Sequence, residues 1–192
     1  MTAAATMGTV LLRPLAFIWN GAKSVLRDRR CLIGLAALLG VWTLAFVRLF
    51  DDPTPRIPVL INWTASLPYH VAWLERDPVG LKRGDFILYS FDGLAARDYP
   101  GLKRQPFFKL IAGVPGDAIR VDGRNVFVNE AFVGFAKLRT MDGRALHPVS
   151  AAAVPGGHFY ARGTGVDSLD SRYAEGGFVA VGSIIGRVHP WF

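Results

Sequence analysis

Cysteine is almost absent from this sequence. The single cysteine, Cys31, excludes an internal disulfide, so any folded domain must be held together by its own apolar core. The chain contains no CxxC and no HExxH motif, and its four histidines are scattered. We therefore expect no metal site and no other cofactor.

Charged residues are also scarce, at 19% of the chain, and they are unevenly placed. Residues 1–30 hold five basic residues and one acid, which leaves a net charge of only +3 out of +7 for the rest of the chain. A mildly basic remainder does not indicate a nucleic-acid-binding protein. The basic N-terminal segment suits the anionic headgroups of membrane lipid, which we expect as a partner.

Charges are missing altogether between Cys31 and Val47, and the apolar run continues past Arg48 to Phe50. About 20 apolar residues are needed to cross a bilayer, with a lower limit near 17. The pattern predicts a single transmembrane anchor over residues 31–50. A buried core helix is the disfavoured alternative, because core helices are seldom apolar all round.

The direction of the anchor follows from its flanking charges. Basic residues near the end of a span remain on the cytoplasmic side, which places residues 1–30 inside the cell and everything after Phe50 outside. A cleaved signal peptide is disfavoured because the positive segment is long and no clear cleavage site follows the run. Residues 51–58, with three prolines, are typical of a short stiff linker.

Helical periodicity is scarce in residues 59–192, the predicted external domain. Short apolar runs are separated by Gly, Pro, Asn and Asp, which is typical of strands. The runs begin at Pro58, Asp85, Phe107, Ala118, Asn125, Gly157, Gly177 and Ser183. Asp122-Gly123 indicates a tight hairpin. We predict a mostly β, antiparallel, curled or barrel-like domain, with a looser, Ala-rich segment over residues 129–156.

A candidate nucleophile, Ser66, stands in the stretch "NWTASLP" (62–68), with Thr64 before it and Pro68 after it. Serine is a poor nucleophile until a base removes its proton. His70 is near in sequence but has no obvious supporting carboxylate, so a Ser-His-Asp site is disfavoured. Asn62-Trp63-Thr64 also matches a glycosylation sequon, a pattern too short to carry weight.

The other candidate base is Lys109, in "QPFFKLIAGVPGDAI" (105–119). Burial among apolar residues would favour its neutral amine and lower its pKa. From the residues alone, a lysine on the solvent side of a strand or at a sheet edge is the favoured interpretation. A buried general base is the alternative.

Four segments, in order, resemble the boxes of the signal peptidase I superfamily of membrane-anchored serine/lysine endopeptidases. They are "TASLP" (64–68), "KRGDFILY" (82–89), "KLIAGVPGD" (109–117) and "GTGVDSLDSRY" (163–173), and the resemblance covers residues 60–188. The resemblance implies Ser66 as nucleophile, Lys109 as its base, and the Ser66 N–H and the Thr64 hydroxyl as oxyanion donors. It also implies that Ser168 bonds the Lys109 amine and that Asp170 and Arg172 hold the last box; a surface ion pair is the alternative for that Asp–Arg pair.

Two departures from the housekeeping pattern are informative. Leu67-Pro68 follows Ser66 directly, and the last box opens Gly163-Thr164-Gly165-Val166 and is one residue shorter. This compact form is more similar to the conjugative-transfer branch of TraF-type pilin peptidases. That branch implies a bacterial inner-membrane enzyme with a periplasmic catalytic domain, a pilin precursor with small residues before its cleavage site, and conjugation or secretion components as partners. Cyclisation of the product is implied for some members.

Three other interpretations stay open at this point. The chain could be a general housekeeping signal peptidase, or an inactive peptidase-like assembly factor of a conjugation or secretion apparatus. A self-cleaving repressor shares the serine/lysine chemistry, but the membrane anchor and the missing DNA-binding helices disfavour it.

Overall fold

The structure is a computed structural model that describes residues 28–50 and 53–191 of the chain. The chain divides into two compact units, residues 1–51 and 52–192. The predicted cytoplasmic segment 1–30 lies almost wholly outside the described residues.

The first unit contributes the helix α2 (Arg29–Phe50). Its stretch Arg29–Arg48 has 20 residues and a mean hydropathy of 2.0. At 1.5 Å per residue, 20 residues span about 30 Å, close to the thickness of a bilayer's hydrocarbon core. The helix is therefore long and apolar enough to cross a membrane. An apolar N-terminal helix is confirmed, and its direction through a membrane stays a prediction.

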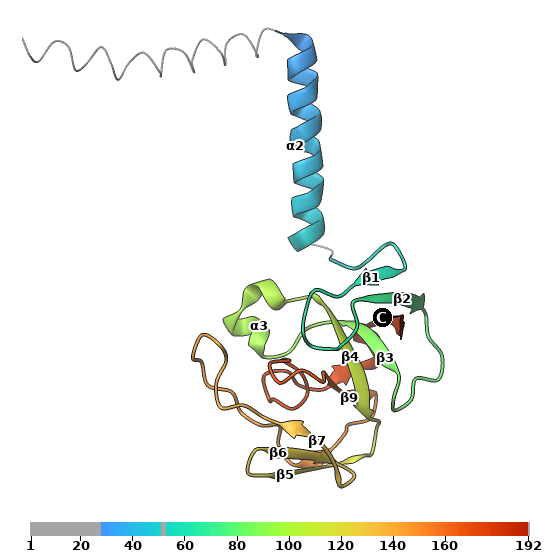
Figure 1. The fold of residues 1–192 in the computed structure, drawn as a ribbon, viewed down its shortest axis with the longest axis vertical. Coiled ribbons are helices and arrows are strands. Elements are labelled where there is room, and N and C mark those ends of the chain that lie inside the picture. The colour runs from blue at the N-terminus through green and yellow to red at the C-terminus, as the bar shows by residue number, and fades with distance from the viewer. Residues whose placement is uncertain (1–27, 51–52, 192) are drawn as a thin grey trace, which may run out of the picture. The chain divides into compact units, whose positions relative to one another are not determined.

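The second unit is built on a seven-stranded antiparallel sheet (Figure 1). The strands lie in the order β1 (Val59–Ile61), β2 (Val71–Arg76), β11 (Ile184–Pro190), β3 (Phe86–Ser90), β4 (Pro106–Gly113), β9 (His158–Arg162) and β10 (Val179–Ala180). The last long strand thus lies between β2 and β3, which ties the C-terminal segment into the middle of the sheet. The short helices α3 (Ala95–Asp98) and η1 (Pro100–Leu102) join β3 to β4, and η2 (Val181–Ser183) joins β10 to β11.

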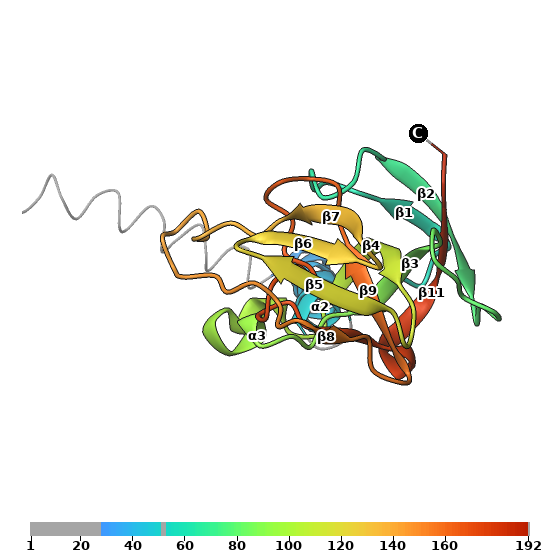
Figure 2. The ribbon, with the colours of Figure 1, turned by 90° about the horizontal axis from the view of Figure 1, so that it is seen from below.

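A second antiparallel sheet has four strands, in the order β7 (Ala131–Phe135), β6 (Asn125–Val128), β5 (Ala118–Asp122) and β8 (Ala152–Ala153) (Figure 2). The prediction of a mostly β, antiparallel domain is confirmed. Neither sheet closes into a barrel, because each ends in two separate edge strands.

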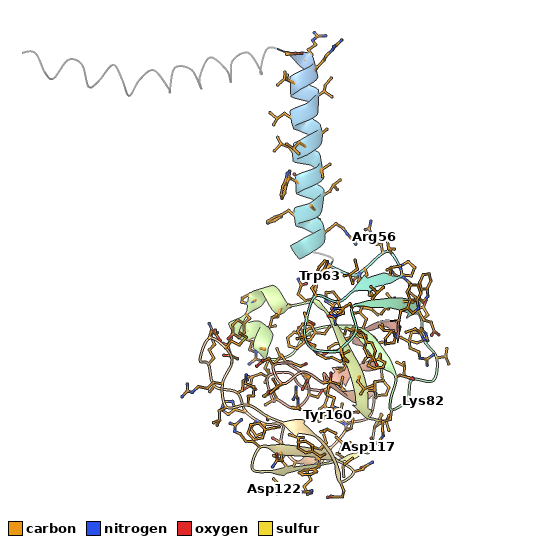
Figure 3. The ribbon with its side chains drawn as sticks, viewed as in Figure 1. Arg56, Trp63, Lys82, Asp117, Asp122 and Tyr160 are labelled. Carbon is orange, nitrogen blue, oxygen red and sulfur yellow. The ribbon has the colours of Figure 1, made fainter. Side chains whose placement is uncertain are left out.

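Three buried apolar clusters hold the second unit together. Residues of β3 and β4 contribute to two of them. Ile87 and Tyr89 on β3 pack into one cluster, while Leu88, which points to the other face, packs into another. Along β4 the buried positions alternate, so Lys109 and Ile111 face the same interior side. The third cluster lies under the four-stranded sheet. Trp63 and Asp122 mark opposite ends of this unit (Figure 3).

The structure contains the predicted hairpin but differs from the predicted strands in two places. The hairpin at Asp122-Gly123 is present, with Asp122 paired to Asn125. The sequence pattern does not predict the strand β2, because "VAWLER" ends in two charged residues and lacks a clear alternation of apolar and polar positions. The segment 129–156 is less loose than predicted: it contains β7 and β8 and buries Val149 and Val154.

Candidate active site

Ser66 lies on the loop 62–70, which joins β1 to β2 and is closed at its base by the pairing of Ile61 with Val71. The Asn62 backbone N–H donates to the His70 carbonyl at 2.8 Å, which extends this closure by one residue. Ser66 is half-buried. Within the described chain, neither its hydroxyl nor its backbone N–H has a hydrogen-bond partner, so both remain available to a substrate.

A second loop, residues 163–165, holds the Ser66 loop from the other side. The backbone N–H groups of Thr164 and Gly165 donate to the Ser66 carbonyl at 2.8 and 3.1 Å. The contact is close: a Cβ added at Gly163 would lie 2.6 Å from the Ser66 carbonyl oxygen, and one at Gly165 would lie 2.2 Å from that of Ala65. Only glycine fits at these two positions.

Lys109 is buried on β4, with 3% of its surface exposed. The favoured expectation from the residues alone, a solvent-facing lysine, is therefore wrong. The pairing of β3 with β4 and the alternation along β4 turn this side chain inward. Its Nζ donates to Ser168 Oγ at 2.9 Å and lies 5.3 Å from the centre of the Phe107 ring.

Burial changes the protonation of Lys109. Desolvation lowers the pKa of its amine, the nearby Asp170 raises it and Arg172 lowers it, and the net result is a pKa of about 8. About a tenth of this amine is thus neutral at pH 7, far more than for an ordinary lysine. A neutral amine has a lone pair and can accept a proton.

The last box, residues 163–172, folds around a buried ion pair. The Asp170 carboxylate accepts hydrogen bonds from Arg172 Nε and from the Gly163 backbone N–H, at 2.9 and 2.8 Å. Arg172 also donates to the carbonyls of Gly165 and Ser168, at 3.0 and 3.1 Å. Asp170 and Arg172 are 0% and 4% exposed, so the surface ion pair considered as an alternative is wrong. The pair fixes Ser168, and through Ser168 it fixes the Lys109 amine.

Ser66 and Lys109 line one cavity of about 520 Å³. No hydrogen bond joins their side chains within the described residues. Hydrogen bonds of this kind are commonly long or absent before substrate binds. The remaining lining is largely apolar and comes from residues 59–64, 105–108, Pro55, Leu88 and Leu169.

Thr64 also lines this cavity, but its hydroxyl is already bonded. Thr64 Oγ1 donates to Asn62 Oδ1 at 2.8 Å. A further cavity of about 420 Å³ is lined by residues 63–65, Leu67, Pro68, His70, Thr164 and Gly165. Trp63 and Thr64 line both cavities. The loop that carries Ser66 therefore borders two recesses.

A separate, mostly apolar cavity of about 460 Å³ is formed by α3, η1, residues 137–146 and 167–169, Tyr173 and Glu175. It contains neither Ser66 nor Lys109, although Ser168 and Leu169 form part of its wall.

The structure thus places the predicted residues Ser66, Thr64, Lys109, Ser168, Asp170 and Arg172 in one region. Sequence reasoning missed Asn62, which it treated only as a sequon, and the two glycines that allow the loops to touch. An Asn two residues before a Thr is the signal of an Asx turn and could have indicated the first.

The family model of signal peptidases, peptidase S26, matches residues 37–192. The chain belongs to this family. The match includes all of the site residues above, and it makes the chain a member of a serine peptidase family whose role is that of a membrane signal peptidase. The predicted signal peptidase superfamily is confirmed, and the TraF-type branch stays a prediction.

Among solved structures, the chain is similar to a signal peptidase I from Enterococcus faecalis V583, with 20% identity and a TM-score of 0.35. That match covers 56% of this chain and 96% of the other. The family assignment rests on the match over residues 37–192, since a likeness this weak adds nothing to it. The comparison with curated proteins found no match.

Proposed function

We propose that this member of the signal peptidase family is a membrane-anchored serine endopeptidase in which Ser66 is the nucleophile and Lys109 the general base. One observation carries the proposal. A buried amine with a lowered pKa lines the same cavity as a serine whose hydroxyl has no partner among the described residues. Retaining a desolvated lysine destabilises a fold, so its presence beside a free hydroxyl is better explained by chemistry than by structure.

The reaction follows from these groups. Neutral Lys109 takes the proton of Ser66, and Ser66 Oγ attacks the scissile carbonyl carbon. The carbonyl oxygen becomes an oxyanion, which the Ser66 N–H and the Thr64 hydroxyl stabilise. The protonated Lys109 returns the proton to the leaving amine as the peptide bond breaks and the acyl-enzyme forms. Water, deprotonated by Lys109, then attacks the acyl carbon, and the bond to Ser66 Oγ breaks as Lys109 returns the proton to Oγ and the acid is released.

The substrate we propose is an exported precursor with small residues before the cleavage site. The compact Ser66–Leu67–Pro68 segment and the short 163–166 loop favour the TraF-type conjugative branch, with a pilin precursor as the substrate. Conjugation or secretion components would then be its partners, and nucleic acid would not. A cyclising member would release the acyl-enzyme with the substrate's own amine instead of water.

The test is the state of exported precursors in the source cell. Ser66→Ala should stop the processing of one or a few precursors, detected by sequencing the N-termini of exported proteins. Ser183→Ala, in which the hydroxyl lost is bonded only to the Ala180 carbonyl, is the matched control and should process normally. A single accumulating pilin-sized precursor supports the conjugative branch, and many accumulating precursors would support a housekeeping enzyme instead. Normal processing by Ser66→Ala would refute the serine peptidase proposal.

A further inference from the structure

Asn62, the first residue of the loop that carries Ser66, makes four side-chain hydrogen bonds. Its Nδ2 donates to the Tyr69 carbonyl at 2.8 Å and to the Leu67 carbonyl at 3.4 Å. Its Oδ1 accepts from the Thr64 backbone N–H at 3.1 Å and from Thr64 Oγ1 at 2.8 Å. Two donors and two acceptor sites are all that a side-chain amide offers. Its entire capacity is therefore used inside the loop that carries Ser66.

These contacts fix which end of the amide faces which part of the loop. Two carbonyl oxygens can accept only from the NH₂ group, so the amide oxygen must face Thr64. The hydrogen bonds on the NH₂ side hold the residues after Ser66, and those on the oxygen side hold the residue two places before it. Asn62 thus fixes the loop on both sides of the nucleophile.

Asn62 Oδ1 also sets the orientation of the Thr64 hydroxyl. That hydroxyl has one proton, and in this structure the proton points to Asn62. To stabilise an oxyanion the hydroxyl must turn from Asn62 to the substrate. Asn62 Oδ1 keeps the Thr64 backbone N–H when this happens, so the turn leaves no polar atom of Asn62 unpaired.

We propose that Asn62 is a positioning residue for peptide cleavage: it holds the Ser66 loop and orients the Thr64 hydroxyl, which it releases when the oxyanion forms. This inference rests on the proposed function. Asn62 acts through Thr64 and Ser66 and does not touch the reacting atoms.

The experiment uses the purified full chain in detergent and an internally quenched peptide with Ala-Xaa-Ala before the scissile bond. Asn62→Ala should lower kcat by about 10- to 100-fold, less than the loss of an oxyanion donor itself, and change KM less than about threefold. Asn62→Asp keeps the acceptor for Thr64 but places a carboxylate against two carbonyl oxygens. It should lower kcat as well, and it provides a second variant if Asn62→Ala folds poorly.

A double-mutant cycle with Thr64→Val separates positioning from plain stability. Valine removes the hydroxyl and keeps the backbone N–H. If Asn62 acts through that hydroxyl, Asn62→Ala should cost less in the Thr64→Val background than in the wild type, so that the two effects on kcat do not multiply. Fully multiplicative effects, or a loss confined to KM, would overturn the proposal.

Asn129 provides the matched control. Its amide also bridges two partners, the Asp117 carboxylate and the Ala118 backbone N–H, but it lies beside the four-stranded sheet, at the end of β6. Asn129→Ala should lower the melting temperature and leave kcat unchanged. Wild-type kcat in Asn62→Ala, with Ser66→Ala inactive, would refute the role of Asn62 alone. Absence of cleavage by the wild type, or cleavage by Ser66→Ala, would refute the proposed function itself.

Discussion

Burial of Lys109 destabilises the folded protein, but it also supplies the neutral amine that the proposed reaction needs. The pKa of the Lys109 amine is near 10.5 in the unfolded chain and about 8 in the folded chain. The charged amine is therefore more stable in the unfolded chain. At about 1.4 kcal/mol per pKa unit, the folded state loses about 3 kcal/mol wherever the amine is protonated in both states. Because the folded pKa is the lower one, this loss is complete below about pH 8 and shrinks as the pH rises from 8 to 10.5.

We therefore expect Lys109→Met to stabilise the protein near pH 7. The gain should be about 2 kcal/mol, since removal of the hydrogen bond to Ser168 offsets about 1 kcal/mol of the relief. The gain should shrink as the pH approaches 10.5. Melting curves from pH 7 to 10 measure this, with the exposed Lys103→Met as control, for which we expect no such trend. A destabilised Lys109→Met protein at every pH would contradict the burial argument.

The same residue predicts the pH dependence of cleavage. Activity should rise about tenfold per pH unit below pH 8, where protonation of Lys109 limits the reaction, and level off above it. Lys109→Arg should be inactive, because a guanidinium stays protonated and cannot accept the Ser66 proton. Initial rates of peptide cleavage between pH 6 and 10 check both statements. An active Lys109→Arg enzyme would exclude Lys109 as the base.

At the scale of elements, the site depends on the close contact between loops 62–70 and 163–165. The hydrogen bonds from Thr164 and Gly165 to the Ser66 carbonyl form only because no Cβ keeps the backbones apart. The two glycines of the 163–166 segment thus permit a backbone-to-backbone contact with the Ser66 loop.

Gly165→Ala should therefore disrupt the site. An added Cβ would lie 2.2 Å from the Ala65 carbonyl oxygen, and backbone atoms cannot move away cheaply. We expect kcat/KM to fall at least 100-fold, with a modest loss of melting temperature because the contact joins two loops and no part of the three apolar clusters. Gly182→Ala is the control: nothing lies within 4 Å of its added Cβ, and it should behave as wild type. Equal activity of the two variants would show that the loops can separate without cost.

The sequence predicts the strands of the domain better than it predicts the contacts that form the site. The short apolar runs predicted β3, β4 and β9, because strand formation is encoded locally in alternation and turn residues. The burial of Lys109 could not be read in the same way: it depends on β3, on β9 and on Ser168, which is 59 residues away along the chain. The resemblance to a family supplied the site, whereas the hydrogen bonds of Asn62 and the packing of Gly163 and Gly165 needed coordinates.

At the scale of the whole molecule, the second unit contains all of the site. The three apolar clusters lie between Leu60 and Val188, the lining of the Ser66–Lys109 cavity begins at Pro55, and α2 contributes to none of them. The anchor and the chemistry are thus separable in the chain. The family match, which begins at residue 37, includes both the greater part of α2 and the whole β unit.

We predict the direction of α2 through a membrane from its flanking charges, and this prediction can be tested without reference to activity. Residues 1–30 carry five basic side chains, and α2 begins at Arg29 and Arg30, whereas nothing comparable follows directly after Phe50. By the positive-inside rule, a phosphatase that is active only outside the cell membrane, fused after Phe192, should be active. Replacing Lys23, Arg27, Arg29 and Arg30 with glutamine should reduce that activity by removing the orienting charge, while replacing Arg97, Lys103, Arg104 and Arg120 in the β unit should not. An inactive fusion with normal expression would place the β unit in the cytoplasm, where an exported precursor could not reach Ser66 after translocation, and the proposed function would fail with it.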